Sequence, residues 1–324
     1  MSYTFAVIAN ANYGLGIILN CILILLLKSD ISTRLGSYRY LQMTFAVFNI
    51  SWTTFCWFCR AKIFTTRTKF CLFLQYNWFE SLHFLCVYNA FFSLFIVIIT
   101  LHFLHRFWIL YSPSNIKIFS KSRFLLTLGS FAAPEFVIWH AASYFLFSAS
   151  TEQRSEIAIS IAEEFGIDAH SKPMIIGEYY RDGHFNLRSL AGLGIFVGVV
   201  SLGCSFMFFF AVRIHSYLSK ANSFSASAKQ IHRTILLTLI VQTVIPLIFI
   251  HLNIGAFLIA PLFQVELSVP RDFTILVAHF FVPLDAIAVL FFMPQYRNAI
   301  AELIWKRKSS YVPEKLKQLK PLIY

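Results

Sequence analysis

Seven long stretches of this 324-residue chain carry almost no charge, and they constrain its fold more than any other feature. An α-helix crosses the hydrocarbon core of a bilayer in about 20 residues. Each stretch is apolar all round and about twice as long as a barrel strand. The chain is therefore expected to be all-α, a seven-transmembrane helix bundle. The predicted spans lie at about 5–27, 40–58, 82–104, 124–148, 189–212, 234–257 and 273–293.

The composition excludes several classes of protein. Only 13% of the residues are charged, about half the usual share, so too little polar surface is present to coat a large soluble domain. The P-loop motif, the G-x-S-x-G nucleophile motif and the H-E-x-x-H zinc motif are all absent. Cys56 and Cys59 have the spacing of a metal-binding pair but lack a second pair. We therefore expect no enzyme activity, no cofactor and no metal site.

The distribution of positive charge predicts the orientation in the membrane. Lys28, Arg34 and Arg39 follow the first span, and the loops on that side carry 18 of the 27 Lys and Arg residues. Because basic loops stay in the cytoplasm, the N-terminus is expected outside and the C-terminus inside. The net charge of +12 then complements anionic inner lipids, and no nucleic-acid partner is required. The first outer loop disagrees, with four basic residues between 60 and 69.

Two segments outside the spans have helical patterns. Ile157, Ile161 and Phe165 share one face at four-residue spacing, and Thr151 is the predicted cap of that helix. The loop 150–188 is thus predicted either as a lid over the outer mouth or as a solvated loop. After the last span, a helix at about 296–308 is predicted to lie on the inner membrane surface. The seven-helix domain would then cover 1–308, with a cytoplasmic tail at 309–324.

Polar and aromatic residues gather in the outer halves of the predicted spans. Together they predict an outward pocket for a small, largely apolar ligand. The alternative is that the aromatic residues mark the lipid interface and the polar ones join helices. The candidate ligand-binding residues are Trp52, Tyr88, Asn89, Glu135, Trp139, His140, His251, Asn253 and His279.

The inner halves of the spans contain features of a conformational switch. Arg106 closes the third span, Gln242 and Pro246 interrupt the sixth, and Pro283 with Asp285 interrupts the seventh. Proline removes a backbone hydrogen bond and allows a kink, which can give a helix two packing arrangements.

Four motifs occur in order along the chain. They are Leu35-Gly36-Ser37-Tyr38-Arg39-Tyr40-Leu41, His102-Phe103-Leu104-His105-Arg106-Phe107-Trp108, Lys229-Gln230-Ile231 with Gln242-Thr243-Val244-Ile245-Pro246, and Leu284-Asp285 followed by Tyr296-Arg297-Asn298-Ala299-Ile300. Each resembles the corresponding part of nematode serpentine chemoreceptors of the Str and Srj type, over residues 10 to 308.

This resemblance implies a chemosensory G-protein-coupled receptor in the ciliary part of the plasma membrane of sensory neurons. It would detect an environmental odorant or metabolite and activate a heterotrimeric G protein. The residues implied in switching and coupling are His105, Arg106, Gln242, Pro246, Pro283, Asp285, Tyr296 and Arg297.

Two departures from rhodopsin-like receptors bear on the switch. His105 stands where those receptors have an acidic residue before the arginine, which weakens an inactive-state ion pair. The 150–188 loop has no cysteine, so the usual bridge to the third helix is unavailable.

Two other functions fit a polytopic membrane protein. A ligand-gated ion channel of the inverted seven-span kind predicts the N-terminus inside. A proton-coupled transporter would use Glu135 and Asp285. Homo- and hetero-oligomers are both left open.

Overall fold

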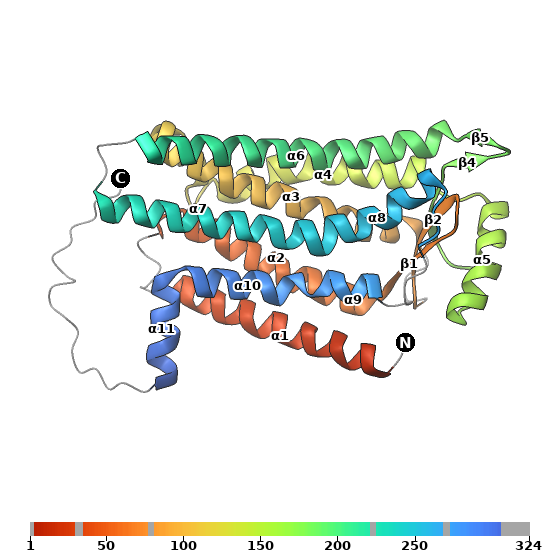
Figure 1. Ribbon diagram of the computed structural model, residues 1–324, viewed down its shortest axis with the longest axis horizontal. Coiled ribbons are helices and arrows are strands. Elements are labelled where there is room, and N and C mark those ends of the chain that lie inside the picture. Colours follow the sequence, from red (N-terminus) through yellow and green to blue (C-terminus); the bar gives the residue numbers. More distant parts are fainter. Residues whose placement is uncertain (1–2, 30–34, 77–80, 221–224, 268–272, 306–324) are drawn as a thin grey trace.

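The computed structural model describes residues 3–29, 35–76, 81–220, 225–267 and 273–305. Its long helices lie side by side in one bundle along a common axis (Figure 1). They are α1 (Tyr3–Lys28), α2 (Tyr38–Cys59), α3 (Leu82–Tyr111), α4 (Phe124–Leu146), α6 (Leu187–Lys220), α7 (Ala226–Pro246) and α10 (Phe281–Phe292). The expectation of a helical bundle is confirmed.

Length and apolarity alone identify five helices in the described residues that could each cross a membrane. A sixth is added if the α10 region and the helix after it are counted as one bent span. The helix α2 is not among them and carries Arg39, Gln42 and Asn49. These polar side chains lower its hydropathy, and the site described below uses two of them.

Proline marks the breaks in the last two helical segments. After Pro246, α7 continues as one stretch of π-helix, η3 (Leu247–Leu252), and then as α8 (Asn253–Ile259), which ends in η4 (Ala260–Phe263). A short helix α9 (Phe273–His279) precedes α10. The helix is interrupted between them, three residues before Pro283. Because proline cannot donate the helical hydrogen bond, such irregular turns are expected at these positions.

The chain turns sharply after α10 into α11 (Pro294–Trp305). The axes of the two segments, Leu276–Phe292 and Pro294–Ala301, differ by 91°. This is the short C-terminal helix expected from the sequence, and its direction across the bundle axis suits a helix on a membrane surface. The cations at 306–308 and the predicted tail at 309–324 lie outside the described residues.

The two ends of the bundle differ, and we call them the cap end and the tail end. The tail end contains α11, the turn of 3₁₀ helix η2 (Pro113–Phe119) and the C-terminal end of α3. The cap end contains the first residues of α1 and a small domain of strands and one helix (Figure 1). The helices are longer than the predicted spans because a helix can continue into the headgroup region. The helix α3, for example, continues to Tyr111, beyond the predicted end at 104.

A three-stranded antiparallel sheet at the cap end was not expected from the sequence. Its strands are β1 (Ala61–Thr65), β2 (Lys69–Leu74) and β3 (Met174–Glu178), in the order β1-β2-β3. Beside it lie a hairpin of β4 (Tyr180–Arg181) and β5 (His184–Phe185) and the helix α5 (Thr151–Phe165). We call residues 61–74 and 151–178 the cap.

The sheet of the cap is buried on both faces. Alternate strand residues face opposite sides of a sheet. One set, which includes Ile63, Leu72 and Ile175, packs into the core of the helix bundle. The other set, which includes Phe73 and Ile176, packs against α5 in a second core with Ile157 and Ile161. The cap end is therefore built in three layers: bundle, sheet and α5.

The helix α5 follows the predicted pattern with a different cap residue. Ile157 and Ile161 are buried against the sheet, and Phe165 packs on Phe64 and Phe73. The N-cap is Ser150 rather than the predicted Thr151. The Ser150 hydroxyl accepts from the Gln153 backbone amide, and the Gln153 side chain accepts from the Ser150 amide. This reciprocal capping box satisfies two amides that a cap at Thr151 would leave open.

A glycine on α6 sets the close approach of α6 to α3. A Cβ atom at Gly203 would lie 2.0 Å from the Ile96 Cγ2 atom. We expect Gly203→Leu to destabilise the folded chain by about 1–3 kcal/mol, because it overfills this contact. Gly198→Leu on the same helix is the matched control, since a Cβ there would meet nothing within 4 Å. Thermal unfolding of the two purified variants measures the difference, and equal melting temperatures would contradict the prediction.

Candidate functional site

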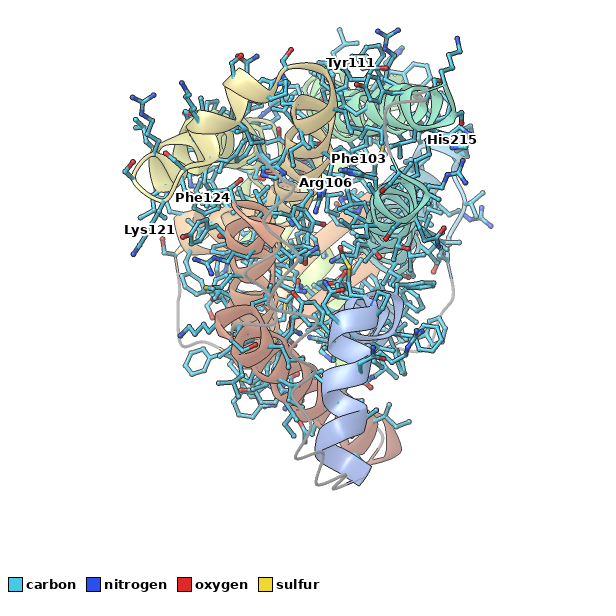
Figure 2. All side chains as sticks on the ribbon, turned by 90° about the vertical axis from the view of Figure 1, so that its left-hand side faces the viewer. Phe103, Arg106, Tyr111, Lys121, Phe124 and His215 are labelled. Carbon is cyan, nitrogen blue, oxygen red and sulfur yellow. The ribbon has the colours of Figure 1, made fainter. Side chains whose placement is uncertain are left out.

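Arg106 lies in the interior of the bundle near the tail end. Viewed from that end, Arg106 and Phe103 lie toward the middle of the helices, whereas Lys121 and His215 lie at the periphery (Figure 2). The Arg106 guanidinium carbon lies 3.8 Å from the centre of the Tyr38 ring on α2. No hydrogen-bond partner is present among the described residues for the Arg106 Nε and Nη2 atoms. The face of an aromatic ring thus takes the place of a carboxylate as the partner of this cation.

His105 binds the start of α2 from the same turn of α3. Its Nε2 atom and the Ser37 hydroxyl are 2.9 Å apart and hydrogen-bonded. Its ring also packs edge-on against Phe119 of η2, at 4.9 Å between ring centres. An acidic side chain in this apolar contact would cost far more to bury than a neutral imidazole does. His105 therefore holds α3, the start of α2 and η2 together at the tail end.

A chain of buried side-chain hydrogen bonds leads from Tyr38 toward the centre of the bundle. The Gln42 amide donates to the Tyr38 hydroxyl at 2.7 Å and to the Gln242 side-chain oxygen at 3.2 Å. The Gln242 amide in turn donates to the Asp285 carboxylate at 3.2 Å. This chain connects α2, α7 and α10, and Arg106 adds α3 through the Tyr38 ring.

Asp285 is the centre of this network and is 1% exposed. Its second carboxylate oxygen accepts from the Asn49 side-chain amide at 3.0 Å. Asn49 also donates to Asn20 on α1 at 3.4 Å. Five helices (α1, α2, α3, α7 and α10) therefore meet in one connected set of polar and cation–π contacts, which suits a structure that switches as a unit.

The remaining predicted switch residues lie around this network. Pro246 and Pro283 are buried at the two helix breaks, and Tyr296 is buried at the start of α11. Arg297, by contrast, is exposed on α11. The structure therefore gathers His105, Arg106, Gln242, Asp285 and Tyr296 at or near the network and leaves Arg297 outside it. The part of each in switching stays a prediction.

The predicted ligand-binding residues do not form one pocket lining. Trp52 and Tyr88 are packed between α2 and α3, with ring centres 5.7 Å apart. Tyr88 is fully buried and its hydroxyl contacts the Cys56 sulfur at 3.5 Å. These two residues act as part of the aromatic core between these helices. His140 stacks with His83 and Tyr144 on another face of α4.

A second group lies where α3, α4 and α6 meet. Glu135, Trp139 and Ser143 are spaced four residues apart, so they share one face of α4. The Asn89 amide of α3 donates to the Ser143 hydroxyl at 2.9 Å. Trp139 stacks on Phe196 of α6 at 4.2 Å between ring centres. We call Asn89, Glu135, Trp139 and Ser143 the α4 cluster.

Two polar atoms of the α4 cluster have no hydrogen-bond partner among the described residues. They are the indole nitrogen of Trp139 and one carboxyl oxygen of Glu135, and both atoms are buried. Buried polar groups are normally paired, so an unpaired donor and an unpaired carboxyl one turn apart mark a place where a polar ligand group fits.

A third group lies on the kinked last spans. The Asn253 amide donates to the backbone oxygens of Thr274 and Phe249, at 2.8 and 3.3 Å, and so joins α8 to α9. The His251 Nδ1 atom hydrogen-bonds to the Pro246 carbonyl across the π-helical stretch. His279 ends α9. These residues fix the geometry of two irregular helices, which favours a structural role for Asn253 and His251.

Sequence reasoning missed Tyr38, Gln42, Asn20, Asn49 and Ser143 as site residues. Four of them are polar residues inside uncharged stretches, where such groups must find a partner. That signal identifies them as buried polar groups. The partners cannot be found in the same way, because Asn49 and Asp285 are 236 residues apart in the chain.

The cap buries two of the four positive charges of the basic loop at 60–69. Lys62 and Lys69 are each more than nine-tenths buried, although both belong to the basic loop at 60–69. Lys69 forms ion pairs with Glu156 of α5 and Glu178 of β3, at 2.5 and 3.1 Å. Burial lowers the pKa of Lys69, but hydrogen bonds to these carboxylates outweigh it and leave the pKa raised. In the basic loop at 60–69, the charge of Lys69 is therefore neutralised by two carboxylates of the cap.

Lys62 gives the cap a pH dependence of predictable sign. Burial, with the neighbouring Arg60 charge, lowers its pKa to about 8. Because the folded state disfavours the charged form, cap stability should rise as pH increases from 7 toward 10. We expect a rise of about 1–2 kcal/mol, reduced by partial screening in water. The rate of protease cleavage of the cap in the purified protein should therefore be lower at pH 9 than at pH 7.

The matched variants for this prediction are Lys62→Met and Lys172→Met. Lys62→Met should remove the pH dependence, because methionine does not titrate. Lys172 donates to the Gln75 backbone oxygen at 2.9 Å, so Lys172→Met should weaken the cap and leave the pH dependence in place. A cap of the parent protein that is cleaved faster at the higher pH would contradict this account.

Comparisons with known proteins agree with this architecture. The family model described as the serpentine-type 7TM GPCR chemoreceptor Str matches residues 5–301. The chain is 24% identical to serpentine receptor class r-10 of Caenorhabditis elegans, over 90% of this chain and 88% of that one. It is also 24% identical to serpentine receptor class J-38 of the same organism, over 92% of each chain. G-protein coupled receptor str-33, also from that nematode, is 20% identical over 91% of this chain and 89% of its own.

Proposed function

Because the chain belongs to the Str family of serpentine seven-transmembrane GPCR chemoreceptors, we propose that it binds a small, largely apolar chemical near its cap end. Ligand binding would shift the bundle toward a state that activates a heterotrimeric G protein at the tail end. A ligand shifts such an equilibrium only as far as its affinities for the two states differ. The membrane would be the plasma membrane, in the cilia of sensory neurons.

The proposed orientation places the cap end outside and the tail end in the cytoplasm. The excess of Lys and Arg in the loops at the tail end supports it. Burial of Lys62 and Lys69, and the pairing of Lys69 with two carboxylates, further supports it, since these are two of the four charges that opposed it. Anionic inner lipids would then meet the basic loops.

The contact between Arg106 and Tyr38 carries this proposal. It joins α3 to α2 at the end where the G protein would bind, and Tyr38 is connected to α7 and α10 through Gln42 and Gln242. Separation of these helices would expose Arg106, a buried cation with unpaired guanidinium nitrogens. The exposed guanidinium can then donate to backbone carbonyls of a G-protein α subunit.

The test uses cells that express the chain with a promiscuous G protein and a calcium reporter. A panel of volatile and lipophilic compounds should contain at least one that gives a concentration-dependent response. Arg106→Ala should abolish that response at equal surface expression. Arg213→Ala is the control, because Arg213 is an exposed arginine at the same end that packs on Tyr111. An undiminished response in Arg106→Ala would remove Arg106 from the coupling role.

A further inference from the structure

The cap covers the end of the bundle above the α4 cluster. Its strand β3 contacts α3, α4 and α6, and its strand β1 contacts α8 and α9. The sheet therefore reaches from one side of the bundle to the other. Because both faces of the sheet are buried, neither offers a water-filled passage through the described residues.

A column of aromatic rings fills the space between the sheet and the α4 cluster. A Cβ atom at Gly177 in β3 would lie 3.1 Å from the Phe147 ring. Phe147 packs on Phe196 at 5.2 Å between ring centres, and Phe196 stacks on Trp139 at 4.2 Å. The path from the sheet to Trp139 is thus closed by side chains in contact.

The two residues that follow the cap, Tyr179 and Tyr180, are bound to the opposite side of the bundle. The Tyr179 hydroxyl donates to the Leu258 backbone oxygen and the Tyr180 hydroxyl to that of Leu262, each at 2.7 Å. On the near side, the Ile176 amide donates to the Phe147 carbonyl at 2.8 Å. These bonds join β3 and the two residues after it to α4, α8 and η4. Separating the cap from either side of the bundle therefore breaks hydrogen bonds.

The α4 cluster is close to the membrane. Only 17% of the residues in the most apolar stretch of α4, and 17% of those in α6, are buried, against 67% in α3. The cluster lies where these two peripheral helices meet α3, and Glu135 is only partly buried. A molecule dissolved in the bilayer therefore has to pass only between α4 and α6. A molecule in the external water has to pass α5, the sheet and the aromatic rings beneath the sheet.

We propose that the ligand reaches the α4 cluster from the outer leaflet of the membrane, between α4 and α6, and not from the external water. The ligand is then a lipophilic molecule that partitions into bilayers and carries one hydroxyl group. That group accepts from the unpaired Trp139 indole N–H and donates to the unpaired Glu135 carboxyl oxygen. The inference rests on the proposed function for the role of the α4 cluster and for the orientation of the cap.

The test needs no known ligand. Ser143→Cys places a thiol in the α4 cluster, and Ser155→Cys places one on the exposed surface of α5 as the control. Intact cells are treated with a charged, water-soluble methanethiosulfonate or with a long-chain alkyl maleimide that partitions into membranes. Labelling of the unmodified chain is subtracted. The ratio of the two rates at one thiol cancels the intrinsic reactivity of that thiol.

The ratio of alkyl maleimide to methanethiosulfonate labelling should be at least about tenfold higher at Ser143→Cys than at Ser155→Cys, because water reaches the cluster only when the cap opens. Ile161→Glu, which disrupts the core between α5 and the sheet, should restore methanethiosulfonate labelling at Ser143→Cys. If Ser143→Cys does not reach the cell surface, Asn89→Cys replaces it.

Equal ratios at the two positions would overturn the proposal, and so would a Ser143→Cys thiol that neither reagent labels. Thiol labelling does not depend on G-protein coupling. A receptor that gives the expected ratio but no calcium response would contradict the proposed signalling alone.

Discussion

Replacing Tyr38 with leucine is expected to raise the ligand-independent signal of the receptor. The Tyr38 ring is fully buried and lies 3.8 Å from the Arg106 guanidinium carbon. A cation–π contact away from water contributes about 2 kcal/mol, which corresponds to roughly a 30-fold change in the balance of two states. Leucine has no ring face, so this restraint on Arg106 is lost.

Tyr38→Phe is the matched control for Tyr38→Leu. Phenylalanine keeps the ring beneath Arg106 and loses only the hydroxyl, which accepts from Gln42 at 2.7 Å and also interacts with Arg106. Its ligand-independent calcium signal should stay close to that of the parent chain at equal surface expression. A Tyr38→Leu receptor as silent as Tyr38→Phe would show that the ring face does not restrain Arg106.

Asp285→Ala should remove most of the folded receptor from the cell surface. The Asp285 carboxylate accepts from the Asn49 and Gln242 amides, and both of these donors are buried. Without it, two buried amides lose a partner, at a cost of about 1–3 kcal/mol each. The sum is a large part of the stability of a typical domain. Surface labelling of a tagged receptor and thermal unfolding in detergent measure the loss.

Glu135 is the natural comparison for Asp285, because both are acidic residues inside predicted spans. One Glu135 carboxyl oxygen has no partner among the described residues, so Glu135→Gln breaks no hydrogen bond at that oxygen. This variant should reach the surface at the level of the parent chain and should change only the response to ligands. Equal surface levels for Asp285→Ala and the parent would contradict the role given to the network.

The sequence predicted the helical bundle because its signal is local. A stretch without charge and about 20 residues long has few alternatives to a membrane-spanning helix. The breaks near Pro246 and Pro283 were predictable for the same reason, since proline acts on its own turn. Arg106 and Asp285 were identified as unusual residues in such surroundings, before any partner was known.

The partners and the cap were beyond local reasoning. The Tyr38 ring and Arg106 belong to different helices, so only tertiary packing shows that one restrains the other. The strands β1 and β2 are short and carry Lys62 and Lys69, which were assigned from the sequence to the first outer loop. Their third strand, β3, comes from a loop about a hundred residues later. Pairing over that distance leaves no periodic trace in the sequence.

Accessibility of epitope tags on intact cells tests the central claim most directly. A tag before α1 should bind antibody on intact cells, and a tag after the C-terminus should bind only after the membrane is permeabilised. This result follows from an odd number of spans with the cap end outside and Arg106 near the cytoplasm. Detection of the C-terminal tag on intact cells, or protection of the N-terminal one, would contradict it.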